Sequence, residues 1–179
     1  MTTAIMLDIE TLSTAPNATV LSVGAVKFNP YTDDAPHSDM HWRLFIEEQQ
    51  DLGRAVDEST LGFWAKQSPS VIEEAFGEQG RITVIDFMAQ LNKYLSGSKS
   101  IWCHGPQFDM VILEDLFNDY NHHKSWHYYN VMDSRTLFNL MPVDPRKAIQ
   151  QELHNALEDA RYQAIGVQES IKHFMMKKR

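Results

Sequence analysis

The sequence predicts one α/β domain built on a mixed sheet that is flanked by helices. Two observations carry this prediction: three β-rich apolar segments open the chain, and the rest alternates amphipathic helices with short apolar strands. The length of 179 residues is that of one domain, and a hydrophobic fraction of 43% supplies a sizeable core. Because neither internal repeats nor linker-like tracts interrupt the pattern, we assign residues 1–179 to a single domain.

Three strands are expected at the start of the chain. In residues 4–10, apolar side chains at the odd positions point one way, whereas Asp8 and Glu10 point the other way. Residues 19–28 are β-rich and apolar on both faces, as in a central strand. Residues 40–46 suggest a third strand. Three consecutive strands of this kind imply an antiparallel meander.

The second part of the chain alternates helices with short strands. Apolar residues at i, i+3, i+4 and i+7 in residues 84–95 predict an amphipathic helix. The later elements, in chain order, are a strand at 100–104, a helix opened by Pro106, a strand at 128–132, a helix at 134–140 and a helix at 155–175. The expected sheet therefore has five strands, three antiparallel and then two parallel.

Composition and charge narrow the class of protein. Sixteen basic and 24 acidic residues give a net charge of −8, which speaks against a protein that binds nucleic acid mainly through a basic face. Cys103 is the one cysteine, so no internal disulfide can form, and a reducing compartment fits best. Since neither an export segment nor a long apolar run is visible, we expect a cytoplasmic protein with no membrane partner.

Two carboxylates share one face of the opening strand. Residues two apart on a strand point the same way, so Asp8 and Glu10 lie roughly 6.5–7 Å apart along it. Such a pair can bind one divalent cation or share two. The alternative is an exposed strand face whose acids meet only water, and the spacing by itself does not decide between them.

Three later residues also carry candidate chemistry. Asp109 heads the apolar stripe of the helix after Pro106, where a buried acid would need a partner, although a helix dipole also favours a first-turn acid. Asp159 lies beside the alanine stripe of the last helix, where a solvated acid is the alternative reading. His154 precedes Asp159 by five residues, so the two converge only if His154 lies on the loop that enters the helix.

Taken together and in order, these residues resemble the DEDDh 3′–5′ exonucleases, the DnaQ-like family. The resemblance extends from residue 5 to about residue 164. Its three motifs are Asp8-x-Glu10, Phe108-Asp109 after a glycine turn, and His154 followed five residues later by Asp159. Residues 131–137 also look like the D-[ST]-R-T-L segment that stands between the second and third motifs.

Two further stretches look like a smaller group within that family. Residues 59–69 resemble the T-x-x-[FW]-W-x-x-Q-S-P stretch, and residues 102–109 the W-x-x-G-x-x-F-D stretch, of the phage and prophage exonucleases and the related adenylate-preferring bacterial exoribonucleases. The sequence does not separate these subgroups from one another.

The resemblance implies a ribonuclease-H-like fold, a homodimer and a metal-dependent 3′–5′ exonuclease. Its partner would be single-stranded RNA or DNA with a free 3′ end, and its products nucleoside 5′-monophosphates. The resemblance also implies two divalent cations, Mg²⁺ or Mn²⁺, with Asp8 bridging both, Glu10 and Asp159 binding the water-activating ion and Asp109 supporting the second. His154 would then be the general base that deprotonates water.

Substrate contacts are expected at four other residues. By resemblance, the backbone after the first two acids approaches the terminal nucleotide, so Thr11 and Leu12 are candidates. Trp64 and Gln67 could face the last base, by stacking and by a polar contact respectively. The alternative for Trp64 is core packing, since buried aromatic rings dominate protein cores.

Two other functions compete with this one. The chain could be a catalytically idle module of the nuclease fold that binds nucleic acid, but such a module has no need of all five acidic and histidine residues. It could also be a metallophosphatase that acts on small phosphate esters. Cleavage of an oligonucleotide separates both alternatives from an exonuclease.

Overall fold

Within residues 3–148 and 154–177, which the computed structural model describes, six strands form one mixed sheet. The strands are β1 (Ala4–Thr11), β2 (Val20–Phe28), β3 (His37–Leu44), β4 (Arg81–Ile82), β5 (Ser100–Cys103) and β6 (Val131–Asp133). Their order across the sheet is β4-β3-β2-β1-β5-β6. β1, β2 and β3 form the antiparallel meander, while β5 pairs parallel to β1, and β6 parallel to β5. The predicted α/β class is thus confirmed.

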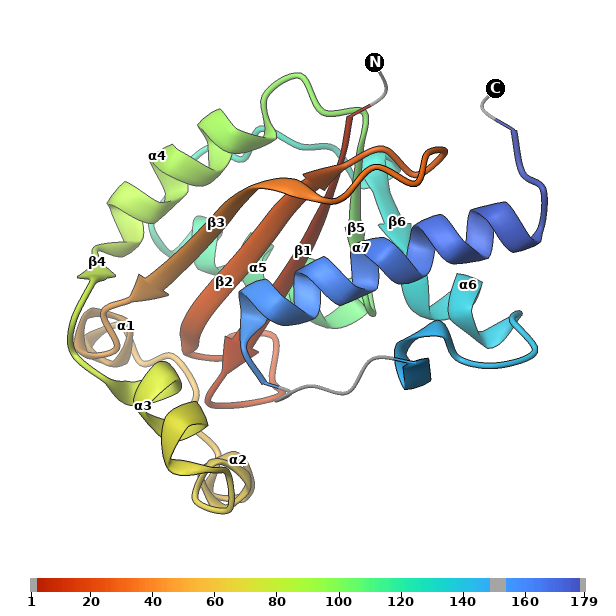
Figure 1. Cartoon of the computed structure of the whole chain (residues 1–179). Helices are drawn as coiled ribbons and strands as arrows, with labels where there is room; N and C mark the ends of the chain where they lie inside the picture. The colour runs from red at the N-terminus through yellow and green to blue at the C-terminus, as the bar shows by residue number, and fades with distance from the viewer. Residues whose placement is uncertain (1–2, 149–153, 178–179) are drawn as a thin grey trace.

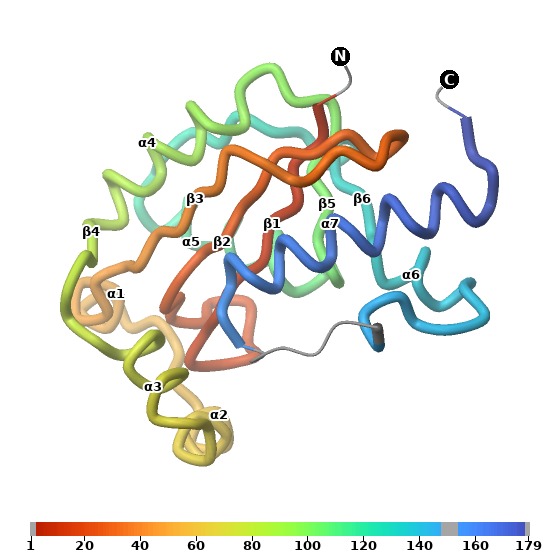
Figure 2. The backbone as a smooth tube through the Cα atoms, in the orientation of Figure 1, coloured from red at the N-terminus to blue at the C-terminus, as the bar shows by residue number. Residues whose placement is uncertain are grey.

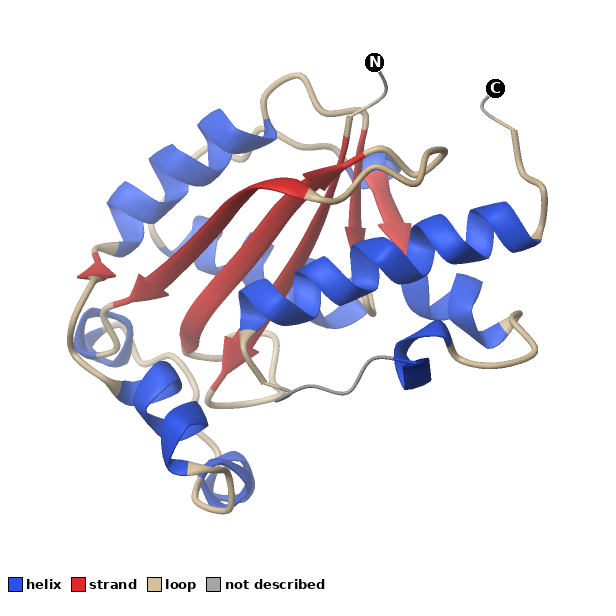
Figure 3. Cartoon of the chain, viewed as in Figure 1, coloured by secondary structure: helices blue, strands red, loops and turns tan. Residues whose placement is uncertain are grey.

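Helices cover both faces of this sheet (Figure 1). They are α1 (Glu47–Asp51), α2 (Glu58–Trp64), α3 (Pro69–Phe76), α4 (Val84–Leu95), α5 (Pro106–Asp119), α6 (Ser134–Asn139) and α7 (Ala156–His173), with short 3₁₀ turns at Tyr128–Asn130 and Pro145–Ala148. α7 crosses one face of the sheet, and α4 and α5 lie against the other (Figure 3). The predicted helices agree with α4, α5, α6 and α7 to within two residues at their ends.

Two strand predictions were wrong in detail. The five-strand sheet omitted β4, which has only two residues and pairs with the end of β3. A two-residue strand shows no alternation of apolar residues, so the sequence pattern does not reveal it. The segment predicted as a strand at 128–132 begins instead as a 3₁₀ turn, and the strand starts only at Val131.

The alternation within β1 divides the core into two layers. Ile5, Leu7 and Ile9 face the layer that contains α4 and α5, whereas Ala4 and Met6 face α7 and α6. Fully burying one such aliphatic side chain contributes roughly 1.5–3 kcal/mol to stability. Asp8 and Glu10 point the same way as Ala4 and Met6, so the strand presents both carboxylates on the α7 side.

α7 is 18 residues long and packs a face of small side chains on the sheet. Ala160, Ala164 and Val167 are fully buried there, so the helix axis can approach the strands closely. Among the described residues, none of the helices combines the length and the apolar character that crossing a membrane requires.

A third apolar cluster lies beneath α2 and α3, at the end of the sheet where β2 begins (Figure 2). Its buried members are Leu12, Leu21, Trp64, Val71 and Ala75. The cluster fixes α2 beside the carboxyl end of β1. This end of the sheet, where the parallel strands β1 and β5 both terminate, is where ligand sites of α/β proteins usually lie.

Candidate active site

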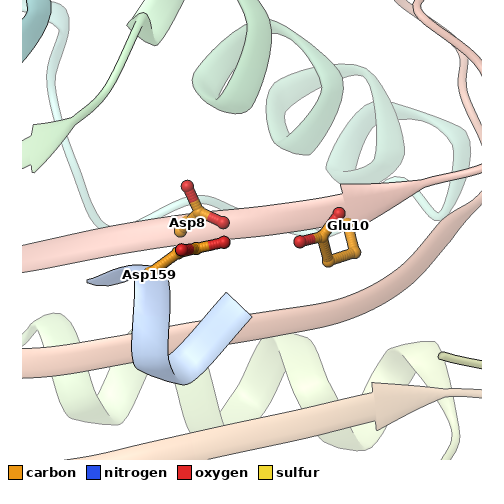
Figure 4. Close-up of side chains that lie close together, drawn as sticks. All are labelled: Asp8, Glu10 and Asp159. Carbon is orange, nitrogen blue, oxygen red and sulfur yellow. The ribbon is translucent and has the colours of Figure 1, made fainter. Parts of the chain in front are cut away.

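Three carboxylates gather at the carboxyl end of β1. Asp8 and Glu10 extend from the strand, and Asp159 from the first turns of α7 lies against them (Figure 4). Each offers a carboxylate oxygen, and these oxygens all lie within 4.8 Å of one another. All three residues are partly buried. The structure therefore brings together two sequence motifs that are about 150 residues apart, as the sequence analysis expected.

A close approach between α7 and β2 places Asp159 at this position. Gly24 of β2 pairs with Asp8 of β1, and a Cβ atom at Gly24 would lie 2.2 Å from backbone atoms of Ala156 and Leu157. Only a residue without a side chain lets the helix begin there. The Asn155 side chain then caps α7 by accepting the backbone N–H groups of Leu157 and Glu158 at 3.1 Å.

His154 lies on the loop before α7, as the sequence predicted for convergence with Asp159. Its backbone N–H donates to Oδ2 of Asp159 at 3.1 Å. Its φ of +76° is left-handed, an uncommon conformation for a residue with a side chain. The imidazole ring meets the rings of Phe63 and Trp64 edge to face, with centroids 4.8 Å and 6.3 Å away. The loop backbone and the ring are thus both held in place.

Asp109 reaches the site from the opposite helical layer. It stands in the first turn of α5, which starts after Gly105 at φ +117° and Pro106. Its side chain is 4% exposed and does not belong to the three-carboxylate group. Its charge nevertheless raises the pKa values of Asp8 and Glu10, so it lies close enough to act on the same cluster. The sequence left open whether Asp109 is a buried acid that needs a partner or a first-turn acid favoured by the helix dipole, and the structure places it in the first turn and buried.

The carboxylates are in an environment that disfavours their charged forms. Burial, followed by the charges of Asp109, Glu10 and Asp159, raises the pKa of Asp8 well above its ordinary value. Burial and the charges of Asp159 and Asp109 raise the pKa of Glu10 to about 8. Burial also raises the pKa of Asp109 to about 7, against hydrogen bonds from the backbone of Asp109 and Ile9.

For Asp159, burial raises the pKa, while the backbone hydrogen bond and the charge of His154 oppose the rise. Without cations the cluster therefore keeps protons that exposed acids would release. A group of hard oxygen donors with this need for positive charge fits a divalent cation such as Mg²⁺ or Mn²⁺. The residues that would hold such cations are Asp8, Glu10, Asp159 and Asp109.

Gln163 is part of this site, although the sequence analysis did not select it. Its side-chain Nε2 donates to Oδ1 of Asp8 at 2.8 Å. Gln163 follows Asp159 by four residues on α7, so the two side chains lie on the same face of the helix. That spacing is the one signal in the sequence that could have indicated it.

A pocket of about 310 Å³ opens beside the carboxylates. It is lined by Ile9, Glu10, Thr11, Thr14, Ser59, Thr60, Phe63, Trp64, Phe108 and His154. Phe63 is 40% exposed, so its aromatic ring is open to a ligand in this pocket. The sequence analysis had included Phe63 in a family motif without giving it a role.

The four predicted substrate contacts lie in different places. Thr11 lines the pocket, but its hydroxyl already donates to the Ser13 carbonyl oxygen at 2.7 Å. Trp64 also lines the pocket, but it is 2% exposed and donates from Nε1 to the Thr11 carbonyl oxygen, which favours the alternative of core packing over stacking on a base.

The other two candidates do not line the pocket. The Leu12 side chain is buried in the third cluster, so only its backbone is left to meet a nucleotide, and the expected backbone contact stays a prediction. The Gln67 amide donates to the Phe63 carbonyl oxygen at 3.1 Å. Gln67 lies outside the pocket lining, so the structure does not bring it to the site.

Three solved nuclease structures have an arrangement of elements similar to that of this chain. Exonuclease X in complex with 5′ overhanging duplex DNA aligns with a TM-score of 0.61 at 12% identity, over 97% of this chain and 94% of that one. The nuclease domain of 3′hExo, a DEDDh family member bound to rAMP, gives 0.62 at 11% identity, over 96% and 92%. The E. coli exonuclease I complex with single-stranded DNA gives 0.69 at 13% identity, over 97% and 41%. These likenesses show the ribonuclease-H-like exonuclease fold.

Sequence comparison agrees with the structural one. An exodeoxyribonuclease of Enterobacteria phage T4 is 26% identical over 125 residues, which are 64% of this chain. The match spans about half, 55%, of the phage protein. The model of the Rv2179c-like 3′–5′ exoribonuclease domain matches residues 3–171. With the DEDDh motifs and fold in place, the chain belongs to the family of Rv2179c-like 3′–5′ exoribonuclease domains.

Proposed function

We propose that this protein is a metal-dependent exonuclease that removes nucleoside 5′-monophosphates one at a time from the 3′ end of single-stranded RNA or DNA. One observation carries the proposal: the oxygens of Asp8, Glu10 and Asp159 lie within 4.8 Å of one another, and the same Asp159 fixes the loop that bears His154. A cation site and a base are therefore adjacent. Membership of a 3′–5′ exoribonuclease family supports the same activity.

The carboxylates would supply the ligands for two divalent cations. When bound, Mg²⁺ or Mn²⁺ contributes the positive charge that activates a water molecule and stabilises the departing 3′ oxygen. Asp8 would be shared by both ions, Glu10 and Asp159 would bind one, and Asp109 would support the other. Burial raises the pKa of Asp109, and burial with the charges of Asp159 and Asp109 raises the pKa of Glu10, so the positive charge of bound cations would favour the ionised form of both carboxylates.

His154 would act as the general base. Its ring lines the pocket beside Glu10, and imidazole is the side chain most often used for this role. His154 takes a proton from water as the water oxygen attacks the terminal phosphorus. The bond from phosphorus to the 3′ oxygen breaks, the phosphate stays on the released nucleotide, and the shortened strand keeps a 3′ hydroxyl. The aromatic contacts of His154 hold the ring ready for this step.

The pocket fits the terminal nucleoside of a single strand. Its exposed aromatic ring, Phe63, offers a stacking surface that every base can use. Structures of similar fold that contain single-stranded DNA, overhanging duplex DNA or rAMP support a nucleic-acid substrate with a free 3′ end. Because the net charge of the chain is −8, bound cations rather than a basic face would attract the phosphates.

Three wider predictions accompany this proposal. We propose that residues 1–179 work as one domain and that the protein acts in the cytoplasm, where an unpaired cysteine such as the buried Cys103 stays reduced. The homodimer that the family resemblance implies stays a prediction.

Matched RNA and DNA oligonucleotides, labelled at the 3′ or the 5′ end, test the function directly. With Mg²⁺ or Mn²⁺, a 3′ label should appear in mononucleotide at once, while a 5′ label should move through a ladder of shortening products. Asp8→Ala should abolish both signals. Binding without cleavage would identify the idle module instead. Hydrolysis of small phosphate esters with intact oligonucleotides would identify the metallophosphatase.

A further inference from the structure

We propose that Gln163 is a positioning residue: its side-chain amide holds the Asp8 carboxylate in the orientation that receives the cations. This inference rests on the proposed function of the carboxylate group as a cation site. It assigns to α7 a second task beside the delivery of Asp159.

The contact is direct and enclosed. Gln163 is 6% exposed, and its Nε2 donates to Oδ1 of Asp8 at 2.8 Å. Because Gln163 and Asp159 stand one helical turn apart on the same face of α7, the helix presents a carboxylate and an amide to the same strand residue. Any shift of α7 would move both groups together relative to Asp8.

The chemistry of an amide suits this position. Gln163 is the one side chain among the described residues that hydrogen-bonds Asp8. Its N–H group occupies one side of Oδ1 and leaves the other carboxylate oxygen for a cation. A lysine or arginine in its place would neutralise Asp8 and compete with the cation, whereas a neutral amide orients the ligand and adds no charge. Hydrogen bonds of this kind commonly orient the ligands of metal sites.

Stability alone does not account for the residue. The other end of the amide, Oε1, is buried and has no hydrogen-bond partner among the described residues. An unpaired buried acceptor lowers stability, so an apolar side chain of the same length would fill this space at a smaller cost. The amide is therefore explained by what its nitrogen does for Asp8.

The same helix contains a matched control. Gln168 is also 6% exposed, and its Nε2 donates to the carbonyl oxygens of Asn29 and Asp34 at 3.0 Å and 2.9 Å. These carbonyls belong to the segment after β2, away from the carboxylates. Gln168 thus makes a buried structural hydrogen bond of the same chemical type on the same helix.

The experiment replaces each glutamine with methionine, which has nearly the same length and lacks the N–H donor. Mn²⁺ binding to the full chain is measured by calorimetry without substrate, together with kcat, KM and thermal unfolding in EDTA. We expect Gln163→Met to weaken Mn²⁺ binding by ~10–100-fold and to lower kcat. KM for the oligonucleotide at saturating Mn²⁺ should not change, because the buried Gln163 does not line the pocket. Gln168→Met should lower the unfolding temperature and leave Mn²⁺ affinity at the wild-type value.

Two results overturn the positioning role: wild-type Mn²⁺ affinity in Gln163→Met, or an equal loss of affinity in Gln168→Met, which would point to a general disturbance of α7. If Gln163→Met does not fold, Gln163→Asn decides, since it keeps an amide on a side chain too short to reach Asp8. Wild-type affinity in that variant also overturns the role.

Failure of the proposed function gives a different result. A wild-type protein that binds Mn²⁺ and cleaves no oligonucleotide overturns the exonuclease activity, while the two methionine variants still decide the role of Gln163. A wild-type protein that binds no Mn²⁺ overturns the positioning role together with the cation site.

Discussion

Asp8 and Gly24 stand directly opposite each other on the paired strands β1 and β2. The carboxylate of Asp8 belongs to the candidate cation site, and the missing side chain of Gly24 makes the space in which α7 begins. This one pair of residues in the sheet thus determines where the Asp8 carboxylate lies. It also determines how closely α7, which bears the Asp159 carboxylate, approaches the sheet. The position of the site depends on a residue that carries no chemistry of its own.

Gly24→Ala should therefore damage the site without touching an acid. The added Cβ would meet backbone atoms of α7 at 2.2 Å, and backbone has little freedom to move, so the start of the helix must shift away from β2. We expect a loss of stability of roughly 1–3 kcal/mol, as for overpacked cores, and weaker Mn²⁺ binding. Thermal unfolding and calorimetry measure the two effects.

Gly62→Ala is the control for that substitution. Gly62 lies in α2 with nothing within 4 Å of an added Cβ. Alanine there should stabilise the protein by roughly 0.4–1 kcal/mol and leave cation binding unchanged. Equal behaviour of the two variants would contradict the close-approach argument.

The metal-free protein should lose stability as the pH rises. The pKa of Glu10 is raised to about 8 and that of Asp109 to about 7 in the folded chain, whereas both are about 4 in an unfolded chain. The folded state therefore binds more protons than the unfolded state at intermediate pH. The stability that these two groups contribute is complete below pH ~4, and it is lost as the pH rises to ~8. Unfolding temperatures in EDTA from about pH 5 to about pH 9 measure the effect.

Glu10→Gln should flatten that dependence, because the amide does not titrate. Saturating Mg²⁺ should also flatten it in the wild type, since the cation replaces the protons. The raised pKa values of the cluster would be contradicted if the unfolding temperature of the wild type rose across this range, and rose by more than that of Glu10→Gln.

Asp159→Asn should remove cation binding and keep the loop. The asparagine oxygen can still accept the backbone N–H of His154, but it lacks the charge that a cation needs. We expect a loss of activity of at least ~100-fold. Replacing a residue that only orients a metal ligand already costs ~10–100-fold in metal affinity or activity, and Asp159 would be a ligand itself. The metal-free variant should unfold at a higher temperature than the wild type, since one repelling charge is gone. Glu158→Gln, at the adjacent residue outside the cluster, should leave both activity and Mn²⁺ affinity near wild type.

His154→Gln should separate catalysis from cation binding. Loss of a general base typically costs ~10²–10⁴-fold in rate, while the four carboxylates remain, so kcat should fall and Mn²⁺ affinity should change little. Single-turnover kinetics with excess enzyme isolates the chemical step. The comparison variant is His123→Gln. His123 is exposed and lies in the loop after α5. If both histidine variants lose activity equally, His154 is not the base.

Phe63→Ala should weaken binding of the oligonucleotide and leave the cation site intact. Stacking of a base on an aromatic ring is worth ~1–3 kcal/mol by alanine substitution, so KM should rise by roughly 5–150-fold. Leu61→Ala is a matched control in the same helix, because Leu61 is 41% exposed and Phe63 is 40% exposed, but only Phe63 lines the pocket. A KM that rises equally in both variants would remove the stacking role.

The residues of the candidate site could be selected from the sequence because they follow motifs in order. Asp8 and Glu10 alternate with apolar residues on a strand, Asp109 follows a glycine–proline helix start, and His154 and Asp159 have a spacing that requires a loop followed by a helix. Each of these features is local in the sequence. The structure places them as the local patterns indicated.

The remainder depends on contacts that no local pattern encodes. Trp64 and Phe63 are neighbours in a short helix, and only the packing of α2 on the sheet determines that the first is buried and the second exposed. Gln163 acquires a role only because Gly24 lets α7 lie close to β1. These are tertiary consequences of register and helix position, so the sequence alone left both a substrate contact and core packing open for Trp64 and missed Gln163.

α7 and the loop before it contribute Asp159, Gln163 and His154 to the candidate site. All three follow the other residues of the site in the sequence. During synthesis on the ribosome, the strand that bears Asp8 emerges long before α7 can dock on it. The acids of a partly made chain consequently cannot form the complete ligand group.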